Sequence, residues 1–442
     1  MEKKQEKTAG KIDTIKTEEK IVERKKSPWN EIIFAQTNLL DNLECLAEMF
    51  ELVLPILKSK DEERNEKIKA LSVEIAGGKI RQYTTKSMQD AKEFLSYVRK
   101  MRRADVMFRQ NVVSSIVSKF DEFFSTILRI SFEKNIDWLK NIDKKLSYRE
   151  ILEIESLDVL KGDLIIKEID LMMRDSHYNQ ITFLDSKLKL GIEQSFSGWK
   201  DILEITERRN LFVHTGGEVT EQYLENCKKY EIEIDTKIKE GVCLSAGDKY
   251  IRKALDSFYE LCVHISQATV RRLFDNCFEE ADKILNNESV NLFNQERWEL
   301  AERLFEFALD IPEKLTSKGD IKYYYLINLC IALKFGGKDF LTKLHSVDWT
   351  PFHTKYHFAV AVLEERFEDA ERFMRNQAVL EEMSEEFFKD WPLLRDFRKT
   401  DNFKKAYKDI FNKDIDCEII EEAKQAIEAE QVEKRNVEII SA

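Results

Sequence analysis

Helix-breaking residues are scarce in this chain, because only 13 of its 442 residues are glycine and only 5 are proline. Both counts are low for a chain of this length, while charged residues make up 35% of the sequence. Lysine, glutamate and leucine, which favour helices, are abundant instead. The composition therefore predicts an all-α fold, divided over two or three domains at this length.

Long hydrophobic runs are also missing, since no apolar stretch approaches the 18 residues of a membrane-spanning helix. The N-terminus is charged and lacks the hydrophobic core of a signal peptide. The seven cysteines are scattered without any Cys-x-x-Cys spacing, which argues against a disulfide framework and a zinc site. We therefore expect a soluble, cytoplasmic protein with no membrane partner, no metal and no other cofactor.

The formal net charge of −12 argues against a protein that coats nucleic acid without specificity. It does not exclude an enzyme with a local basic cleft. Basic residues do cluster in one segment, offset only by Asp105: Arg99, Lys100, Arg102, Arg103 and Arg109. The sequence alone leaves two interpretations of this cluster open, a nucleic-acid-binding surface and a solvated helix face.

One segment, Glu207–Gly217, brings together a fixed cation, an amide, a titratable imidazole and a helix stop. Arg209 stays cationic at any working pH, and its planar guanidinium suits a phosphate. Gly216 or Gly217 can adopt a positive φ and end a helix just after His214. That histidine would then lie at the negative end of the helix dipole, which favours imidazolium.

The spacing by itself does not establish a site. On a regular helix, five residues place Arg209 and His214 about 140° apart, so the two side chains would not share a face. They converge only if the last turn loosens at residues 215–217, or if the site lies between two chains. The ordinary interpretation is a salt-bridged surface arginine and a histidine whose hydrogen bonds are satisfied within the protein.

The wider context adds a resemblance to a known family. Arg209-Asn210-x-x-x-His214 resembles the Arg-Asn-x-x-x-His signature of HEPN domains, in the form followed by an aromatic-Leu pair, here Tyr223-Leu224. Two upstream blocks also resemble that family, the apolar helix 112–130, which contains Phe120-Asp121-x-Phe123-Phe124, and the segment Arg174-Asp175-Ser176-His177-Tyr178-Asn179-Gln180. The resemblance covers about residues 105–275.

The resemblance implies a bundle of four or five helices that pairs through a two-fold axis and brings two motifs together across one cleft. It also implies metal-independent cleavage of RNA, in which Arg209 holds the phosphate, His214 transfers protons and Asn210 orients one of these groups. Glu207 or Arg208 would tune the local field. Asp121 either faces the catalytic histidine or is an ordinary carboxylate on the helix surface.

We expect five regions along the chain. They are a charged tail at 1–26, an N-terminal helical region at 27–104, a HEPN-like bundle at 105–285, tetratricopeptide-like repeats at 286–411 and an acidic tail at 412–442. The repeats rest on an internal echo, in which Arg297-Trp298-Glu299-Leu300-Ala301-Glu302-Arg303 recurs 69 residues later as Arg366-Phe367-Glu368-Asp369-Ala370-Glu371-Arg372. Helical solenoids usually bind peptides or protein surfaces.

Several element boundaries follow from local signals. Pro55 is expected to kink or end the first helix, and a charged turn at 59–66 to precede a shorter helix broken at Gly77-Gly78. Separate helices are expected at about 87–103 and 105–135. The segment 230–244 carries the only β-like alternation, and one long helix is expected from Ser245 to about Leu285.

The favoured functional hypothesis is a toxin or anti-phage endoribonuclease that cleaves tRNA or other cellular RNA. It would act as a homodimer, and a protein partner or antitoxin would bind its C-terminal repeats. The alternative is a catalytically inactive dimeric adaptor that binds RNA or protein. A third interpretation, a plain repeat scaffold, requires that the segment 209–214 be buried and internally paired.

Overall fold

The structure is a computed structural model, and it describes residues 28–75, 80–83, 88–141, 148, 154 and 156–415. The architecture of this part is helical, as the composition predicts, apart from one short two-stranded hairpin. The charged tail predicted at 1–26 and most of the acidic tail predicted at 412–442 lie outside the described residues. No helix in the described part of the chain is long and apolar enough to cross a membrane.

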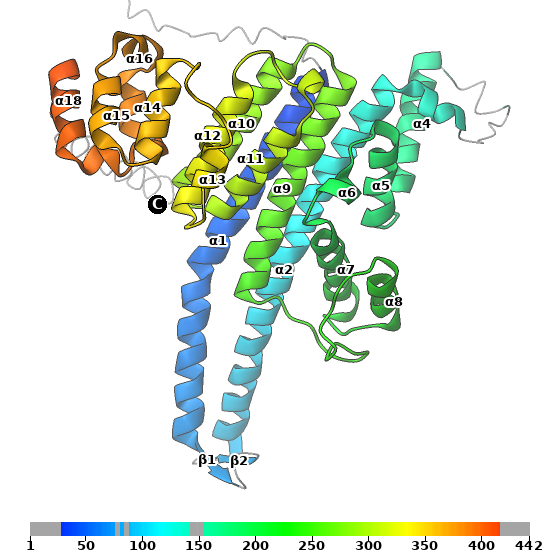
Figure 1. The fold of residues 1–442 in the computed structure, drawn as a ribbon. Helices are drawn as coiled ribbons and strands as arrows, with labels where there is room; N and C mark the ends of the chain where they lie inside the picture. Colours follow the sequence, from blue (N-terminus) through cyan, green and yellow to red (C-terminus); the bar gives the residue numbers. More distant parts are fainter. Residues whose placement is uncertain are drawn as a thin grey trace, which may run out of the picture.

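Three long helices form the centre of the molecule: α1 (Pro28–Leu71), α2 (Met88–Lys134) and α9 (Asp248–Leu273). Each of them packs against the other two (Figure 1). The apolar side chains of α2 recur at i, i+3 and i+4 and are fully or almost fully buried between the helices, namely Val112, Val113, Ile116, Val117, Phe120, Phe123, Phe124, Ile127 and Leu128. This stripe is the one that the sequence predicts as a core helix.

The N-terminal half corrects several predicted boundaries. Helix α1 continues through Pro55 and through the charged segment 59–66, which is helical instead of a turn. Helix α2 is likewise unbroken across residues 104 and 105, where we expected two helices, because no glycine or proline interrupts it. Glutamate, lysine and arginine favour helix, so dense charge on a surface helix is compatible with its continuation.

A hairpin lies where the sequence suggests the end of a helix. Strands β1 (Ser72–Ile75) and β2 (Ile80–Tyr83) pair antiparallel, with Ser72 opposite Tyr83 and Ile75 opposite Ile80. The hairpin joins α1 to α2, and both helices project together beyond the body of the molecule (Figure 1). We call this projection the arm, comprising residues 59–71 of α1, the hairpin and residues 88–104 of α2.

Five shorter helices and a 3-10 turn lie along α2 and α9. They are η1 (Ile136–Asn141), α4 (Leu157–Met172), α5 (His177–Leu188), α6 (Ile192–Ser195), α7 (Trp199–Thr215) and α8 (Glu221–Lys229). The hydroxyl oxygens of Ser176 and Thr220 accept hydrogen bonds from the first turns of α5 and α8, so both residues are N-caps. The β-like segment 230–244 is a loop, with one isolated bridge between Glu218 and Cys243.

The single long helix predicted from Ser245 is two helices. Helix α9 ends at Leu273, and α10 (Phe278–Asn294) begins after a four-residue break. The break contains no glycine or proline, and its turn is made by Asp275 and Asn276. It lets α10 turn back and pack against α9 and against α11 (Trp298–Asp310).

The C-terminal part continues as short helices that lead away from α10 and α11 toward the upper left of Figure 1. They are η2 (Glu313–Leu315), α12 (Ile321–Phe335), α13 (Leu341–Leu344), α14 (Thr354–Leu363), α15 (Phe367–Met374), α16 (Gln377–Glu382), α17 (Glu385–Asp390), η3 (Pro392–Leu394), η4 (Phe397–Lys399) and α18 (Asp401–Phe411). The two copies of the sequence echo begin α11 and α15 in the same local conformation. In each, the preceding glutamate has a positive φ, 54° at Glu296 and 59° at Glu365.

Candidate functional site

Helix α7 carries the motif and ends where the sequence predicts. The backbone N–H of Gly216 bonds to the carbonyl oxygen of Leu211, and Gly216 and Gly217 have φ values of 65° and 98°. A Cβ atom at Gly217 would lie only 2.7 Å from the carbonyl oxygen of Leu244, so this position requires glycine for space as well as for conformation. The stop fixes where the helix presents its last turn.

Helix α7 stays regular to Thr215, so the last turn does not loosen. Arg209 and His214 therefore remain about 140° apart around the helix axis within one chain. The Arg209 side chain is one-fifth exposed, whereas His214 is exposed. The His214 side chain makes no hydrogen bond to any residue that the structure describes.

Arg209 faces α2 and contacts Asp121. Its Nη2 lies 3.3 Å from Oδ2 of Asp121, and the other carboxylate oxygen of Asp121 lies 2.8 Å from Nε2 of His177 on α5. The His177 side chain is buried, and Asp121 is 30% exposed. A carboxylate only accepts hydrogen bonds, so Nε2 of His177 is the protonated nitrogen and donates this hydrogen bond to Asp121. Residues from three helices thus form one polar cluster.

The guanidinium of Arg209 is incompletely satisfied in this cluster. Its Nε is buried and has no hydrogen-bond partner among the described residues. A buried donor without a partner costs free energy unless another group binds it, so such atoms are uncommon in folded proteins. The geometry leaves Arg209 with hydrogen-bonding capacity beyond its single contact with Asp121.

The other motif side chains have different surroundings. Nε of Arg208 lies 2.7 Å from Oε1 of Glu204, and its guanidinium lies 4.3 Å from the ring centre of Tyr250. Glu207 is buried and accepts a hydrogen bond of 2.9 Å from Asn226 on α8. These two residues, expected to tune the site, bind the neighbouring helices and contact neither Asp121 nor His177.

Glu204 is the centre of a second polar network. Its carboxylate accepts hydrogen bonds from the hydroxyls of Tyr223, at 2.9 Å, and Tyr250, at 2.8 Å. Burial and the neighbouring Glu204 charge raise the pKa of both phenols, which therefore remain protonated donors. This network fixes α8 and the start of α9 to the middle of α7. The aromatic residue of the Tyr223-Leu224 pair thus has a structural contact with the motif helix.

Asn210 lies next to Arg209 and is half-buried. Its side-chain amide makes no hydrogen bond within the part of the chain that the structure describes. It is therefore available to a ligand or to a second chain.

His177 was not predicted as a site residue from the sequence, although it belongs to the segment 174–180 that the resemblance includes. Its only local signal is its position directly after the N-cap Ser176.

A separate cavity of about 290 Å³ lies between α9 and α11. His264 lines it, stacked on Phe307 with ring centres 3.8 Å apart, and Nε2 of His264 has no hydrogen-bond partner among the described residues. Burial, helped by the charge of Arg303, lowers the pKa of His264 to about 3. The ring of His264 is therefore buried and neutral.

Among the residues that the structure describes, no group of three or more histidine, cysteine, aspartate or glutamate side chains could hold a metal ion. Comparison with known protein families, with characterised proteins and with solved structures finds no match to this chain.

Proposed function

We propose that this chain is a metal-independent endoribonuclease of HEPN type. The motif around Arg209 and His214 resembles that family, and the observation that carries the proposal is the state of Arg209. Its guanidinium is anchored on one side by Asp121, while its Nε has no partner in the described part of the chain. Its Nη1 is not buried and makes no hydrogen bond to a described residue, so a guanidinium held in this way is suited to bind a phosphate.

The reaction would proceed by attack of a ribose 2′-hydroxyl on the adjacent phosphorus, with departure of the 5′-oxygen. One base must take the hydroxyl proton and one acid must protonate the leaving oxygen. The products would be a 2′,3′-cyclic phosphate and a 5′-hydroxyl. Arg209 would stabilise the negative charge that develops on the phosphorane, and His214 would transfer a proton.

A dimer would meet the geometric requirement that one chain does not. The 140° separation keeps Arg209 and His214 apart on α7, but a two-fold axis close to the end of α7 would bring His214 of one chain toward Arg209 of the other. Such a pair also supplies two imidazoles, one as base and one as acid. The surface position of His214 is compatible with this arrangement.

Asp121 is the positioning residue in this proposal. Its carboxylate contacts both Arg209 and His177, so it restrains the guanidinium and at the same time fixes which nitrogen of His177 is protonated. In a neutral ring, Nδ1 of His177 is then an acceptor. Asn210, half-buried beside Arg209, would orient a phosphate oxygen or the histidine of the second chain.

The test is incubation of total RNA with purified wild-type protein and with His214→Ala, in the presence of EDTA. Wild type is expected to produce fragments that end in a 2′,3′-cyclic phosphate. His214→Ala is expected to lose at least about 100-fold in rate, because general acid–base catalysis contributes 10² to 10⁴. Equal cleavage by both proteins, or cleavage abolished by EDTA alone, would contradict the proposal.

A second candidate is a catalytically inactive adaptor that pairs through the same helices and binds RNA or protein. The regularity of α7 to Thr215 favours it, because the two key side chains diverge in a single chain. The experiment above separates the candidates, since an adaptor leaves RNA intact under all conditions. The third interpretation, a plain repeat scaffold, fits poorly with the exposed side chain of His214.

The biological role proposed for the enzyme is that of a cytoplasmic toxin or anti-phage effector acting on tRNA or other cellular RNA. The C-terminal helices α10–α18 would be tetratricopeptide-like repeats that bind a protein partner or an antitoxin. The matching turns before α11 and α15 support a repeated helix pair, because both copies have a glutamate of positive φ followed by Arg297 or Arg366.

A further inference from the structure

Helix α7 covers one face of α2 along part of its length. At one level Arg209 reaches Asp121, and at another Nε2 of Gln110 donates a hydrogen bond of 3.0 Å to the carbonyl oxygen of Gly216. The second contact lies at the C-terminal end of α7, where the chain turns away. The covered part of this α2 face therefore ends close to Gln110.

The same face of α2 continues into the arm and carries arginines. Arg103 and Arg99 precede Gln110 by seven and eleven residues, which places the three side chains within about 40° of one another around the helix axis. At 1.5 Å per residue, the two arginines lie about 10 and 16 Å beyond Gln110. Arg102 and Lys100 flank them. We call these four residues the basic stripe.

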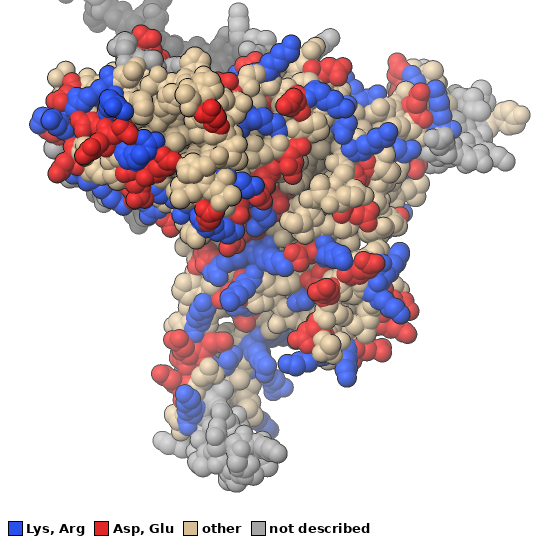
Figure 2. All heavy atoms as spheres, in the orientation of Figure 1, with Lys and Arg blue, Asp and Glu red and all other residues tan. Residues whose placement is uncertain are grey.

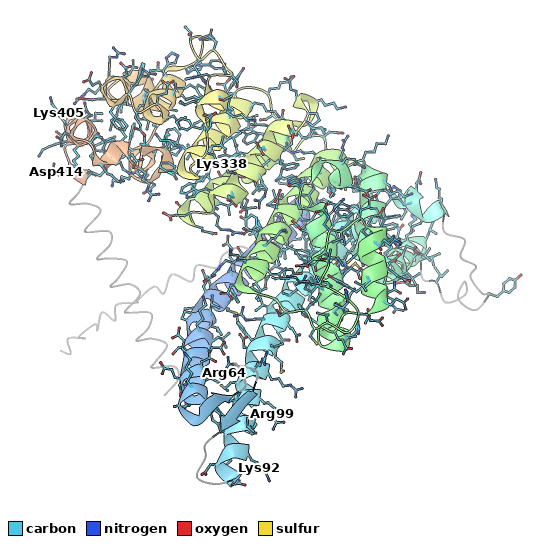
Figure 3. All side chains as sticks on the ribbon, turned by 60° about the horizontal axis from the view of Figure 1, so that its bottom comes forward. Arg64, Lys92, Arg99, Lys338, Lys405 and Asp414 are labelled. Atoms are coloured by element: carbon cyan, nitrogen blue, oxygen red, sulfur yellow. The ribbon has the colours of Figure 1, made fainter. Side chains whose placement is uncertain are left out.

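All four side chains of the basic stripe are exposed. None of them makes a hydrogen bond or an ion pair with a residue in the described ranges. Figure 2 shows blue side chains gathered over this part of α2, beside acidic side chains on the neighbouring part of α1. Figure 3 labels Arg99 on α2 and Arg64 on the facing helix.

On the facing helix, three bases of the arm are paired with acids and only Lys69 is not, so the stripe differs from most of its described surroundings. In α1, Lys60 and Lys67 bond to Glu63 at 2.9 and 2.6 Å, and Arg64 bonds to Asp61 at 2.7 Å. Pairing is thus the more common state of the bases in α1 of the arm, whereas none of the four bases of the stripe is paired with a described residue.

Arg109, which the sequence groups with the stripe, is excluded by the same criterion. Its Nε lies 2.8 Å from Asp105 and its Nη1 lies 2.6 Å from Asp248 at the start of α9. It therefore joins α2 to α9 and presents no free charge. The basic cluster of the sequence divides into one structural arginine and four unpaired bases.

Like charges at this spacing are unfavourable in a helix. Arg99 and Arg103 are an i, i+4 pair, and such pairs destabilise a helix by a few tenths of a kcal/mol when no acid intervenes. The chain as a whole has 12 more acidic than basic residues, so acids are plentiful elsewhere. Four unpaired bases on an otherwise acidic protein are the arrangement expected where a polyanion binds.

We propose that the basic stripe binds the phosphates of single-stranded RNA and guides the strand along α2 toward the end of α7. The distance from Arg99 to Gln110, about 16 Å, corresponds to up to about five nucleotides at 3.4 Å each. The strand would arrive beside His214, one residue before the end of α7. The role in guiding a substrate rests on the proposed ribonuclease function, whereas the binding of RNA by the stripe does not.

The stripe is expected to read phosphates and not bases. Base stacking needs an open aromatic face. The two aromatic side chains nearest in α2 are engaged, since Lys67 lies 5.5 Å from the ring centre of Tyr97 and Phe108 stacks on Phe50 at 6.3 Å. Binding should therefore be independent of base sequence and strongly dependent on salt. Cleavage by 2′-hydroxyl attack also needs a strand that can rearrange, which favours single-stranded RNA over a duplex.

The test measures binding of a labelled 20-nucleotide polyuridine RNA to full-length protein that carries His214→Ala, so that no RNA is consumed. A stripe variant adds Arg99→Gln, Lys100→Gln, Arg102→Gln and Arg103→Gln. A matched control adds Lys314→Gln, Lys318→Gln, Lys343→Gln and Lys399→Gln, which changes the net charge by the same amount on C-terminal helices and turns. Thermal unfolding of all three proteins verifies that they are folded.

The stripe variant is expected to bind more weakly and with a smaller salt dependence than the control. If all four bases contact phosphates, the slope of log K against log salt falls by about 2.8 in magnitude. Between 50 and 200 mM salt, the parent then loses about 50-fold more affinity than the stripe variant. Equal affinities and slopes for the stripe variant and the control would overturn the proposal, as would tighter binding of a matched RNA duplex.

The same set of proteins with His214 restored separates this proposal from the proposed function. If wild type cleaves RNA and the stripe variant cleaves as fast as the control, the stripe is not the track but the ribonuclease stands. If wild type does not cleave RNA, yet the stripe carries the salt-dependent binding, the RNA site stands and the enzymatic function fails.

Discussion

Asp121 and His177 share a hydrogen bond of 2.8 Å, although 56 positions separate them in the chain and they lie on different helices. The remaining oxygen of the same carboxylate contacts Arg209 of the motif. The relationship joins the three segments that the sequence singles out, the apolar helix 112–130, the segment 174–180 and the motif. It gives each of them a role in one cluster.

A double-mutant cycle tests the Asp121–Arg209 contact. Asp121→Asn keeps the shape of the side chain and removes its charge, and Arg209→Gln removes the guanidinium. Both side chains are only partly buried, so we expect a coupling energy of about 0.5 to 1 kcal/mol between the two changes. Urea unfolding of the two single variants and the double variant measures it. Strict additivity would mean that the contact does not stabilise the folded state.

The same variant carries a prediction for activity. If Asp121 restrains Arg209, Asp121→Asn should lower the rate of RNA cleavage by at least about 10-fold and leave the stripe-dependent binding of RNA intact. Rates and affinities on the polyuridine RNA measure the two effects. The matched control is Asp163→Asn on α4, which should change neither the cleavage rate nor the affinity for RNA. Unchanged cleavage by Asp121→Asn would remove Asp121 from the site.

The motif helix and its caps could be predicted from sequence because their signals are local. The N-caps Ser176 and Thr220 and the stop at Gly216-Gly217 each act within one turn of their own helix, and the structure confirms the predicted stop. The contact of Asp121 with His177 could not be predicted in this way. It depends on how α2 and α5 pack, and helical periodicity fixes only which face of each helix is buried.

The arm shows why charge patterns gave wrong predictions of helix boundaries. Residues 59–66 have the composition of a turn as well as of a solvated helix, and nothing in the segment distinguishes the two. In the structure they continue α1 because their charges pair at helical spacing, as in the bond of Lys67 to Glu63. The structure, unlike the sequence, distinguishes the paired Arg109 from the four unpaired bases of the basic stripe.

His264 predicts a dependence of stability on acid pH. Its pKa in the folded protein is about 3, below the ordinary value of 6.5, because the ring is buried. As pH falls below 6.5, His264 binds a proton in the unfolded chain but stays neutral in the folded protein. The free energy of unfolding should therefore fall by about 1.4 kcal/mol for each pH unit between 6.5 and 3 from this residue alone.

His264→Leu is expected to remove this contribution. Its unfolding free energy should vary less steeply with pH than that of the wild type from pH 6.5 downward, even if the loss of the stack on Phe307 lowers stability at every pH. Urea unfolding at pH 4.5, 5.5, 6.5 and 7.5 measures both curves. Parallel curves for the two proteins would show that the histidine is not held neutral.

Glu288 predicts the opposite dependence at higher pH. Burial, together with the nearby charges of Glu44 and Asp41, raises the pKa of Glu288 from 4.5 to about 7. Between these values the unfolded carboxyl loses its proton before the folded one does, so stability falls as pH rises. We therefore compare the unfolding free energy of Glu288→Gln with that of the wild type. This difference should be more favourable to the variant at pH 8 than at pH 4.5, by up to about 3 kcal/mol.

Thermal unfolding at the two pH values measures the effect of Glu288→Gln. The matched control is Glu233→Gln, which removes the same charge from an exposed loop position. The control should shift the melting temperature by a similar amount at both pH values. A Glu288→Gln variant that behaves in the same way would contradict a protonated carboxyl between α1 and α10.

The two glycines after α7 should respond differently to the same substitution. Gly216 has a φ of 65° with open space around its Cβ position, whereas Gly217 has a φ of 98° and faces the carbonyl oxygen of Leu244 at 2.7 Å. Alanine at Gly216 meets only the left-handed backbone and should cost about 1 kcal/mol. Alanine at Gly217 adds a backbone clash and should cost at least about 2 kcal/mol.

Because Gly217 also bonds through its carbonyl oxygen to the N–H of Leu244, the clash would displace the loop that leads into α9. Urea unfolding measures both costs, and equal values for the two alanine variants would show that the end of α7 is not held against that loop.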